Sequence, residues 1–227
     1  MHSNSPPVRS AQDAPHPRLR EVVRRHLEAP FRRVPSDAGR RAFAAVADRL
    51  AERPFVLDAG CGTGVSTLAL AMALAAPAQV AAPPRLVLGV DKSAARLASG
   101  LRVAAAPGAP PNALLLLCEL VDFWQLAAAA GLRCERQYLM YPNPWPKPEH
   151  LRRRWHAHAV LPSILALGGP IELRTNWPVY AEEFALALRV AGWRADCARC
   201  TPHAPVSPFE RKYAQSGHAL WRCVAEP

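Results

Sequence analysis

One cluster of small and acidic residues has the types and spacing needed to hold a nucleoside-like ligand. The chain runs Asp-Ala-Gly-Cys-Gly-Thr-Gly from Asp58 to Gly64, directly after the apolar stretch 55–57. Glycines let the backbone turn tightly and approach a ligand closely. A second apolar stretch, 86–90, ends at Asp91, whose carboxylate can accept hydrogen bonds from both hydroxyls of a ribose. The residues of this predicted site are Asp58, Gly60, Gly62, Gly64 and Asp91.

The glycine spacing narrows the class of ligand. Dinucleotide sites use Gly-x-Gly-x-x-Gly, and phosphate loops end in Gly-Lys followed by Ser or Thr. The Gly-x-Gly-x-Gly spacing here fits neither, which favours a ligand without a phosphate. The string from Asp58 to Gly64 resembles motif I of class I S-adenosylmethionine (SAM) methyltransferases. That resemblance implies SAM as cofactor, with Asp58 at its methionine amino end. A nicotinamide cofactor and a degenerate fold that has lost cofactor binding are the alternatives.

A proline-rich segment follows the predicted strand 137–141. Four prolines occur within 141–148, and proline continues neither a helix nor a strand. Asn143 and Trp145 stand between them, so a polar and a flat side chain are predicted to be held at fixed angles in a substrate loop. The densest positive cluster follows on a predicted basic helix and consists of Arg152, Arg153 and Arg154. We interpret it as a phosphate contact, and a solvated helix face is the alternative.

Three segments together resemble the tRNA (guanine-N7)-methyltransferase family over about residues 54–224. The family has a Phe-Pro-Asp-Pro-Trp-Pro-Lys loop followed by His and basic residues, then a Thr-Asp-Trp-x-x-Tyr turn, then Thr-x-Phe-Glu-x-Arg and Gly-His. The matching segments of this chain are 141–154, 175–180 and 207–218. The resemblance implies a SAM-dependent, RNA-binding enzyme that methylates N7 of a guanine in tRNA, of the type that acts at position 46.

The resemblance also implies roles for individual residues. Those at SAM-contacting positions are Asp58, Asp91, Glu119 and Asn143. Those at guanine-contacting positions are Lys147, Asn176, Ser207 and Glu210. Asn143 is the candidate catalytic residue. Glu119 has an alternative interpretation as an ordinary acid at a helix start. Glu210 can accept from the N1–H and amine edge of guanine, which leaves N7 for the methyl group.

This chain departs from the family pattern at two acids and one hydroxyl. Asn143 and Asn176 stand where the family has Asp, and Ser207 replaces Thr. Guanine N7 becomes cationic on methylation, and an amide dipole balances that charge less well than a carboxylate does. We therefore expect either a slower enzyme of the same kind or a paralogue that acts on another amine or a small molecule. A SAM-fold RNA-binding subunit without catalysis is a third hypothesis, and the intact glycine loop argues against it.

The elements that must position these residues alternate between short apolar and helical segments. This pattern predicts an α/β fold with a doubly wound, mostly parallel, seven-stranded sheet of the Rossmann-like class I methyltransferase type. The predicted strands are 55–57, 86–90, 113–118, 137–141 and 171–175, with a closing hairpin of 193–200 and 218–224. The predicted helices are 66–76, one from Ala94, 123–130, 150–167 and 177–191. Ser36 and Asp37 are expected to cap a helix that runs through Phe43 and Leu50.

The composition of the 227-residue chain supports a polyanionic partner. Its net charge is +10, half of its residues are hydrophobic, and only three of its 28 basic residues are lysines. The preference for arginine fits a coding bias, but the net sign favours a nucleic acid such as tRNA. Residues 1–35, with six prolines and seven arginines, are predicted to form a flexible basic arm, and 36–227 the methyltransferase domain. Without a membrane span or signal peptide, a cytoplasmic location is expected. The sequence leaves monomer and homodimer both open.

Six cysteines are scattered through apolar segments. In a reducing compartment they are interpreted as small buried hydrophobic residues. Cys197 and Cys200 have the spacing of metal ligands, with His203 and Cys223 as possible further ligands. A zinc site usually has a second close pair, which this sequence lacks, so we predict no metal.

Overall fold

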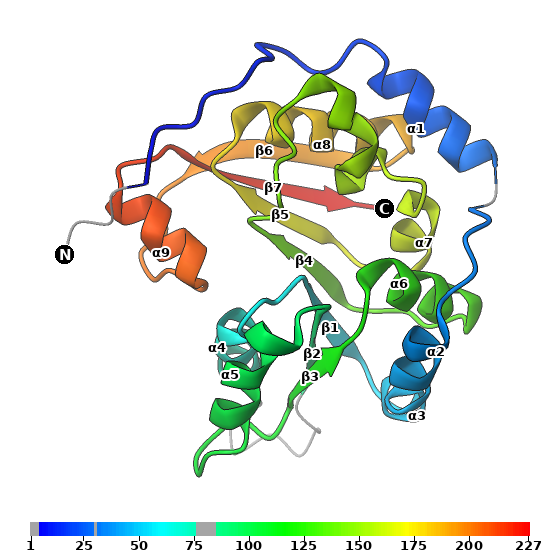
Figure 1. The fold of residues 1–227 in the computed structure, drawn as a ribbon, viewed down its shortest axis with the longest axis vertical. Coiled ribbons are helices and arrows are strands. Elements are labelled where there is room, and N and C mark those ends of the chain that lie inside the picture. The colour runs from blue at the N-terminus through cyan, green and yellow to red at the C-terminus, as the bar shows by residue number, and fades with distance from the viewer. Residues whose placement is uncertain (1–4, 30, 76–84) are drawn as a thin grey trace. The chain divides into compact units, whose positions relative to one another are not determined.

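The computed structural model describes residues 5–29, 31–75 and 85–227, and within them seven strands form one mixed sheet (Figure 1). The strands are β1 (Phe55–Ala59), β2 (Leu86–Asp91), β3 (Ala113–Leu117), β4 (Arg136–Met140), β5 (Ile171–Thr175), β6 (Arg194–Cys200) and β7 (Leu220–Glu226). Their order is β3-β2-β1-β4-β5-β7-β6. The predicted α/β fold with a mostly parallel, seven-stranded sheet is confirmed.

Helices connect these strands. They are α1 (Leu19–Glu28), α2 (Asp37–Ala44), α3 (Ala47–Ala51), α4 (Val65–Ala73), α5 (Ala94–Ala104), α6 (Leu120–Ala129), α7 (Leu161–Ala166), α8 (Pro178–Val190) and α9 (Pro208–Gln215), with two 3₁₀ turns, η1 (Pro148–Arg153) and η2 (Trp155–Ala157). The chain divides into two compact units. Residues 34–138 and 166–169 form the glycine-loop unit, and residues 1–33, 139–165 and 170–227 form the proline-loop unit.

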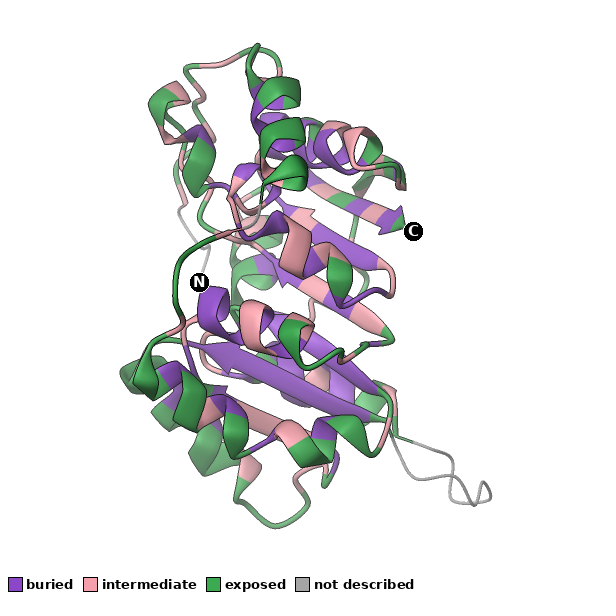
Figure 2. Ribbon diagram, turned by 90° about the vertical axis from the view of Figure 1, so that its right-hand side faces the viewer, coloured by how far each residue is buried: buried purple, intermediate pink, exposed green. Residues whose placement is uncertain are grey.

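The glycine-loop unit is built on buried parallel strands. Every residue of β1 and β2 is buried, and the two strands pair in parallel with Phe55 opposite Leu86 (Figure 2). Continuous apolar strands are typical of a sheet covered on both faces. Figure 1 shows α4 and α5 on one face of β1–β3 and α6 with α2 on the other. The predicted helix 66–76 corresponds to α4, and its last residue lies outside the described residues.

The predicted cap at Ser36 is confirmed, but the helix is shorter than expected. Ser36 Oγ accepts a hydrogen bond from the Gly39 N–H at 3.0 Å and donates one to Asp122 Oδ2 at 2.6 Å. Helix α2 ends at Ala44, and α3 begins only at Ala47. The predicted single helix through Leu50 is therefore two helices.

The proline-loop unit closes the sheet with antiparallel strands. β7 lies antiparallel between β5 and β6, which confirms the predicted closing hairpin. Helix α8 packs on all three of these strands, and α1 packs on α8. Residues Leu19, Val22 and Val23 of α1 are buried. The segment predicted as a flexible arm therefore contains a packed amphipathic helix, whose apolar positions stand among arginines in the sequence. The division into arm and domain at residue 35 stays a prediction.

The predicted basic helix over 150–167 is wrong. The chain forms the 3₁₀ turns η1 and η2 and then the short helix α7. The backbone of Arg154, between the two 3₁₀ turns, is extended, with φ −77° and ψ 133°. Arg152, Arg153 and Arg154 consequently do not share one helix face.

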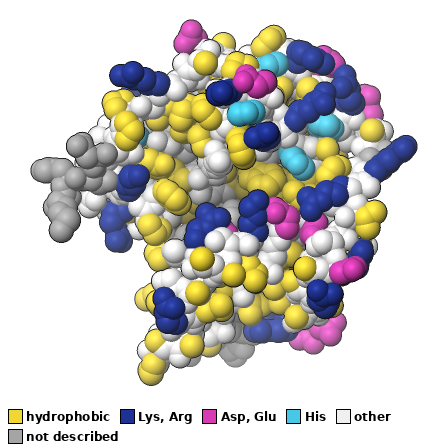
Figure 3. Space-filling view, viewed as in Figure 1, with side chains coloured by type: hydrophobic (Ala, Val, Ile, Leu, Met, Phe, Trp, Pro, Cys, Tyr) yellow, Lys and Arg dark blue, Asp and Glu magenta, His cyan; other side chains and the backbone are white. Residues whose placement is uncertain are grey.

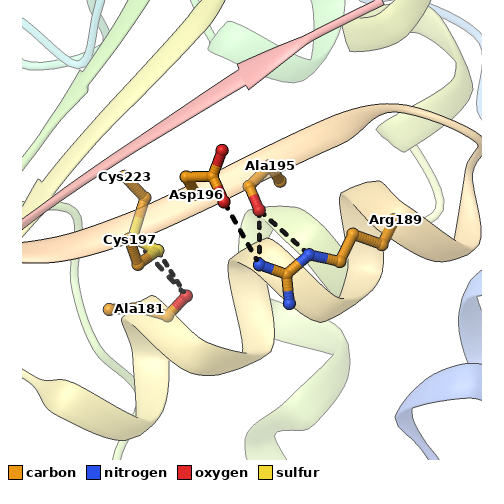
Figure 4. The surroundings of a disulfide bond; sticks show 6 residues. All are labelled: Ala181, Arg189, Ala195, Asp196, Cys197 and Cys223. Carbon is orange, nitrogen blue, oxygen red and sulfur yellow. Dashed lines mark hydrogen bonds and ion pairs between the residues drawn. A yellow bond between two sulfur atoms is a disulfide. The ribbon is translucent and has the colours of Figure 1, made fainter.

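Two of the six cysteines are paired. Cys197 of β6 and Cys223 of β7 lie opposite each other in the antiparallel register and are joined by a disulfide bond (Figure 4). The interpretation as free thiols is wrong for this pair, whereas Cys61, Cys118 and Cys134 are buried free thiols as expected. Within the described residues, no cluster of three or more His, Cys, Asp or Glu is suited to a metal ion. No helix in this part of the chain has the length and apolar character needed to cross a membrane.

Candidate functional site

The glycine loop between β1 and α4 has a backbone that only glycine adopts easily. Gly60, Gly62 and Gly64 have φ values of 78°, 59° and 75°, in the left-handed region. A side chain at Gly64 would also collide with Leu115, at 2.8 Å from the added Cβ. At Gly62, by contrast, an added Cβ would meet no described atom within 4 Å. The backbone at Gly62 therefore borders open space, as a close approach to a ligand requires.

Asp58, at the carboxyl end of β1, has one buried carboxylate oxygen that accepts no hydrogen bond from the described residues. Its side chain is 1% exposed, and its Oδ2 accepts hydrogen bonds from Ser66 Oγ at 2.6 Å and Thr67 Oγ1 at 2.7 Å. Its Oδ1 is buried and has no hydrogen-bond partner among the described residues. Burial raises the pKa of Asp58, and the two hydroxyl donors act in the opposite direction. An orphaned carboxylate oxygen is costly, so this position favours a ligand with N–H donors or positive charge.

Asp91, at the end of β2, closes the loop. Its Oδ2 accepts from the Gly62 N–H at 3.0 Å, and its Oδ1 accepts from the Ser93 N–H at 2.8 Å and from Arg96 Nη2 at 3.1 Å. A carboxylate has about four acceptor positions, so Oδ2 can accept one more hydrogen bond. Ribose hydroxyls are suitable donors. Asp91 is only 4% exposed, so little of its carboxylate is open to solvent.

Glu119 begins α6 but makes no capping hydrogen bond. Its carboxylate pairs instead with Lys92 Nζ at 3.4 Å. Its predicted contact with SAM stays a prediction. The acceptors of Asp58 and Asp91, together with the open backbone at Gly62, fit the ammonium and ribose groups of SAM.

The proline loop holds two residues in the left-handed region. Tyr141 has a φ of 54° and Trp145 a φ of 46°, and such conformations of non-glycine residues are concentrated at functional sites. The Trp145 N–H donates to Asn143 Oδ1 at 3.3 Å. The Trp145 ring lies under the Arg153 guanidinium, 4.8 Å from its centroid, and edge-on to His150 at 5.5 Å. Side chains from both ends of the loop thus fix Trp145, while Asn143 is exposed.

The three arginines after the loop have different environments. Arg152 and Arg153 are exposed, but Arg154 is 2% exposed. The Arg154 guanidinium donates to Trp145 O at 3.0 Å and Lys147 O at 3.3 Å, and it pairs with Glu183 at 2.5 Å. The interpretation of Arg154 as a phosphate contact is therefore wrong in this arrangement, because its donors are already used inside the unit. Arg152, Arg153 and the exposed Lys147 stay candidates.

Ser207 and Glu210, predicted to contact guanine, form the start of α9. Ser207 Oγ accepts from the Glu210 N–H at 3.1 Å, and Glu210 Oε2 accepts from the Val206 N–H at 2.8 Å. This is a variant of the capping box, in which the glutamate reaches one residue further back than usual. Arg174 Nη1 donates to both Glu210 oxygens, at 2.9 and 3.1 Å. Glu210 is fully buried, so the structure gives both residues a structural role and offers guanine no free oxygen.

Asn176, also predicted to contact guanine, is 7% exposed and bonded to His218. Asn176 Nδ2 donates to His218 Nδ1 at 3.0 Å, and His218 Nε2 donates to the carbonyl of Ser5 at 3.2 Å. This assignment makes the imidazole neutral, with its proton on Nε2. An Asp at position 176 would need a proton on the other ring nitrogen, so the amide suits this local arrangement.

Comparisons with known proteins decide the family. The pattern of a family described as "Putative methyltransferase" matches residues 52–223. A tRNA (guanine-N(7)-)-methyltransferase of Stutzerimonas stutzeri is 31% identical over 195 residues, which cover 81% of this chain and 76% of that protein. A protein of the same name from Pseudomonas savastanoi pv. phaseolicola is 27% identical and spans 97% of this chain and 94% of its own length. The chain belongs to the tRNA (guanine-N7)-methyltransferase family.

This methyltransferase also resembles solved structures in its fold. The 16S rRNA methyltransferase KamB matches with a TM-score of 0.57 at 21% identity, covering 86% of this chain and 96% of that one. A 16S rRNA (adenine(1408)-N(1))-methyltransferase mutant with cosubstrate SAM, from Catenulisporales acidiphilia, matches with a TM-score of 0.55 at 20% identity, covering 86% and 93%. The chain is a SAM-dependent methyltransferase of class I.

Several charged residues of this methyltransferase were not singled out from the sequence. Glu172 and Arg174 lie on β5, where residues two apart share a face, and Arg174 Nε donates to Glu172 Oε1 at 2.9 Å. Burial opposes the charged form of Arg174, but Glu210 and Glu172 together raise its pKa. Glu183 of α8 is fully buried. The Ser-x-x-Glu spacing at 207–210 is a sequence signal for α9, whereas no local signal marks Glu183.

Proposed function

We propose that this methyltransferase methylates N7 of a guanine in tRNA, at position 46. The observation that carries the proposal is the proline loop, which holds Trp145 in a left-handed conformation and leaves Asn143 and Lys147 exposed. The relatives that share most of the chain are named tRNA (guanine-N(7)-)-methyltransferases, which supports the same substrate here. The glycine-loop unit would hold the cofactor, and the proline-loop unit the base.

The hydrogen bond of Asn143 bears on the choice between guanine and an amine. Its Oδ1 accepts from the Trp145 N–H, so its exposed group is the amide NH₂, which is a donor. Guanine presents the acceptors O6 and N7 on its Hoogsteen edge. A donor can bind O6 of that edge and leave the N7 lone pair free for the methyl group, whereas Oδ1 keeps one lone pair that an exocyclic amine would have to use. This hydrogen bond therefore supports guanine, and an amine substrate stays the alternative.

The roles of the residues follow from the chemistry of N7. When bound, SAM supplies an electrophilic methyl group on its sulfonium. Guanine N7 has a lone pair and no proton, so the protein needs no general base and acts mainly by alignment. Asn143 and Lys147 would orient the base through O6, which leaves the N7 lone pair free to attack the methyl group. Asp58 and Asp91 would fix the cofactor through its ammonium and ribose groups.

An exposed basic surface in the proline-loop unit suits the tRNA backbone. Helix α1 presents Arg20 and Arg24 beside a shallow groove of about 510 Å³, and neither arginine pairs with an acid in the described residues. Arg18 and Arg25 lower the pKa of Glu21, and Arg152 lies close enough to α1 to add to this effect. Figure 3 shows basic side chains gathered over the region of α1. Arginines fixed on short elements can bind phosphates along a duplex without reading sequence.

Incubation with methyl-labelled SAM and bulk tRNA tests the proposed reaction. The expected result is label in 7-methylguanosine after digestion to nucleosides, and mapping of the modified tRNA should place it at position 46. Label in another nucleoside, or only in a small-molecule fraction, would overturn the proposal. A tRNA transcript with guanine 46 replaced by adenine is the matched substrate control and should accept no label.

The basic surface has its own test. Arg20→Ala and Arg24→Ala together should weaken tRNA binding and reduce the salt slope of log Kd by about 2, since each phosphate contact contributes about one unit. SAM affinity should not change. Arg40→Ala on α2, an exposed arginine of the other unit paired with Asp37, is the matched control. A salt slope equal to that of the parent protein would exclude α1 from the RNA-binding surface.

A further inference from the structure

The proline loop is held from the protein interior by a buried arginine. Arg154 donates from Nε and Nη2 to the carbonyl of Trp145, at 3.2 and 3.0 Å, and from Nη2 to the carbonyl of Lys147 at 3.3 Å. Trp145 is the residue with a φ of 46°. The guanidinium therefore binds the loop at Trp145, the residue with the left-handed backbone, and it does so through the main-chain carbonyl.

The other side of the same guanidinium is bound by Glu183 and by the N-terminal segment. Arg154 Nη1 pairs with Glu183 Oε2 at 2.5 Å, and Nη2 donates to Gln12 Oε1 at 2.6 Å. Glu183 also accepts from the His16 N–H at 2.9 Å and from His156 Nε2 at 3.0 Å. Both Arg154 and Glu183 are nearly inaccessible to solvent, at 2% and 0% exposure of their side chains. Gln12 and His16 thus complete the hydrogen bonds of a buried ion pair.

We propose that Arg154 is a positioning residue for the substrate loop and that Gln12 and His16 of the N-terminal segment keep it in place. Glu183 fixes the guanidinium from one side, and Gln12 fixes it from another. The guanidinium then sets the carbonyls of Trp145 and Lys147, and through them the directions of Asn143 and Lys147. The consequence for catalysis rests on the proposed function of the loop, but the positioning itself does not.

The shape of the guanidinium explains why arginine is needed. Its five N–H donors lie in one rigid plane and reach acceptors in several directions, whereas a lysine ammonium is a compact charge with three rotatable donors. A lysine at position 154 can keep the ion pair with Glu183 but cannot also bind both loop carbonyls and Gln12. Replacement by lysine therefore separates the buried charge from the positioning of the loop.

The test compares four variants by amide hydrogen exchange and by kinetics. Arg154→Lys and Gln12→Ala remove loop or segment contacts, and Gln12→Glu keeps the acceptor oxygen. Arg189→Lys is the matched control, because Arg189 of α8 also donates to a backbone carbonyl of this unit, that of Ala195 in β6 (Figure 4). Exchange is followed in a peptide that covers 141–153 and in one that covers β5. kcat, KM for tRNA and the Kd of SAM are measured in parallel.

Arg154→Lys should raise exchange in the loop peptide about tenfold or more and leave β5 unchanged, because only the loop opens. It should lower kcat about tenfold or more with little change in the Kd of SAM, since small misplacements of reacting groups are costly. Gln12→Ala should do the same to a smaller extent, and Gln12→Glu should match the parent protein. If Arg154→Lys does not fold, the Gln12 pair carries the test alone.

Three results would overturn the proposal. The first is unchanged loop exchange in Gln12→Ala and in any folded Arg154→Lys protein. The second is faster exchange throughout the unit, which would indicate general destabilisation. The third is a loosened loop with unchanged kcat. A parent protein that transfers no methyl group to tRNA refutes the proposed function, but the exchange comparison still decides whether Arg154 positions the loop.

Discussion

The glycine loop and the proline loop are held by different kinds of interaction. The glycine loop is held mostly by backbone hydrogen bonds to the neighbouring strand β2: the Gly60 and Cys61 N–H groups donate to Val90 O at 2.8 and 3.1 Å. The proline loop is bound by a buried side chain, Arg154, which itself depends on residues from distant parts of the sequence. The first arrangement is set by neighbouring strand ends, and the second requires the whole unit to fold around it.

Buried carboxylates of the two units also differ in how completely they are hydrogen-bonded. Asp58 keeps an oxygen without a partner among the described residues, whereas Glu183 and Glu210 have arginine, backbone and side-chain donors on both oxygens. Burial alone would raise the pKa of Glu183, but the donors His156 and Arg154 lower it to about 2. An unsatisfied buried acceptor is suited to a ligand, and a saturated one belongs to the framework.

The largest expected effect comes from breaking the saturated cluster. Glu183→Ala should lower the free energy of unfolding by about 3–5 kcal/mol, because it leaves the Arg154 charge buried without its partner. Urea denaturation followed by circular dichroism measures this loss. Glu182→Ala, at the exposed neighbouring position, is the control and should change stability by less than about 0.5 kcal/mol. A Glu183→Ala protein as stable as the parent would contradict the assigned role of the cluster.

The second-largest expected effect is on SAM affinity, and it distinguishes the glycine-loop site from carboxylates that only support the fold. Asp91→Ala should weaken SAM binding about 10- to 100-fold, since it removes a hydrogen-bonded acceptor and the support of the Gly62 N–H. Calorimetric titration with SAM measures the change. Glu210→Ala should lower stability, because it strands Arg174, but should spare SAM affinity. Equal loss of SAM affinity in both variants would refute the division of roles between the units.

The contrast between the loops also explains what the sequence could reveal. The Gly60–Gly64 pattern is local, so its turn, its flanking strand and its helix follow from neighbouring residues. The three arginines after the proline loop, 152–154, look alike in the sequence. Arg154 is nevertheless buried, because the backbone between η1 and η2 turns it inward. That turn depends on Glu183 and Gln12, 29 and 142 residues away. No local pattern contains such information.

Some missed features did have a local signal. The Ser-x-x-Glu spacing of Ser207 and Glu210 predicts a helix start, but the family resemblance drew attention to their proposed contact with guanine instead. The spacing of Leu19, Val22 and Val23 also predicts one helix face, although arginines surround it. Motif resemblance places residues near a site, and only the packing distinguishes those that face the ligand from those that support it.

A smaller loss of stability is expected as the pH falls, and its source is a histidine of the proline-loop unit. Burial, with contributions from His26 and Arg33, lowers the pKa of His158 to about 4, against an ordinary value of 6.5. The unfolded chain therefore binds a proton at His158 before the folded one does, and stability is lost as pH falls from 6.5 to 4. Because this side chain is partly exposed, the expected loss is only about 1–2 kcal/mol.

His158→Asn should remove that part of the pH dependence. Asn offers an oxygen near the position of Nδ1, which accepts from the Val160 N–H at 3.0 Å, but it does not titrate. Urea denaturation at pH 7 and pH 4.5 compares the variant with the parent protein. His203→Asn, at an exposed histidine, is the control and should keep the parental pH dependence. An unchanged pH dependence in His158→Asn would exclude His158 as its source.

The smallest expected change concerns the amide that distinguishes this chain from its family pattern. Asn143→Asp keeps an oxygen for the Trp145 N–H and adds a negative charge, so the loop should not change shape. A carboxylate favours a base that becomes cationic, and a charge pair at 4 Å is worth up to about 4 kcal/mol at an effective dielectric of 20. Exposure of position 143 reduces this figure, and loss of the NH₂ donor offsets part of it, so transfer to guanine N7 should stay equal or rise by up to about tenfold.

Single-turnover kinetics with tRNA measure this effect, and Asn143→Ala separates charge from loop geometry. Alanine removes the acceptor for the Trp145 N–H, so its rate should fall below that of both Asn and Asp. If Asn143→Asp instead abolishes transfer, the NH₂ donor to guanine O6 outweighs the added charge, and the amide is itself required. The loop would then use a hydrogen-bond donor where the family pattern has a charge, and the difference between the two loops would extend from how they are held to how they act.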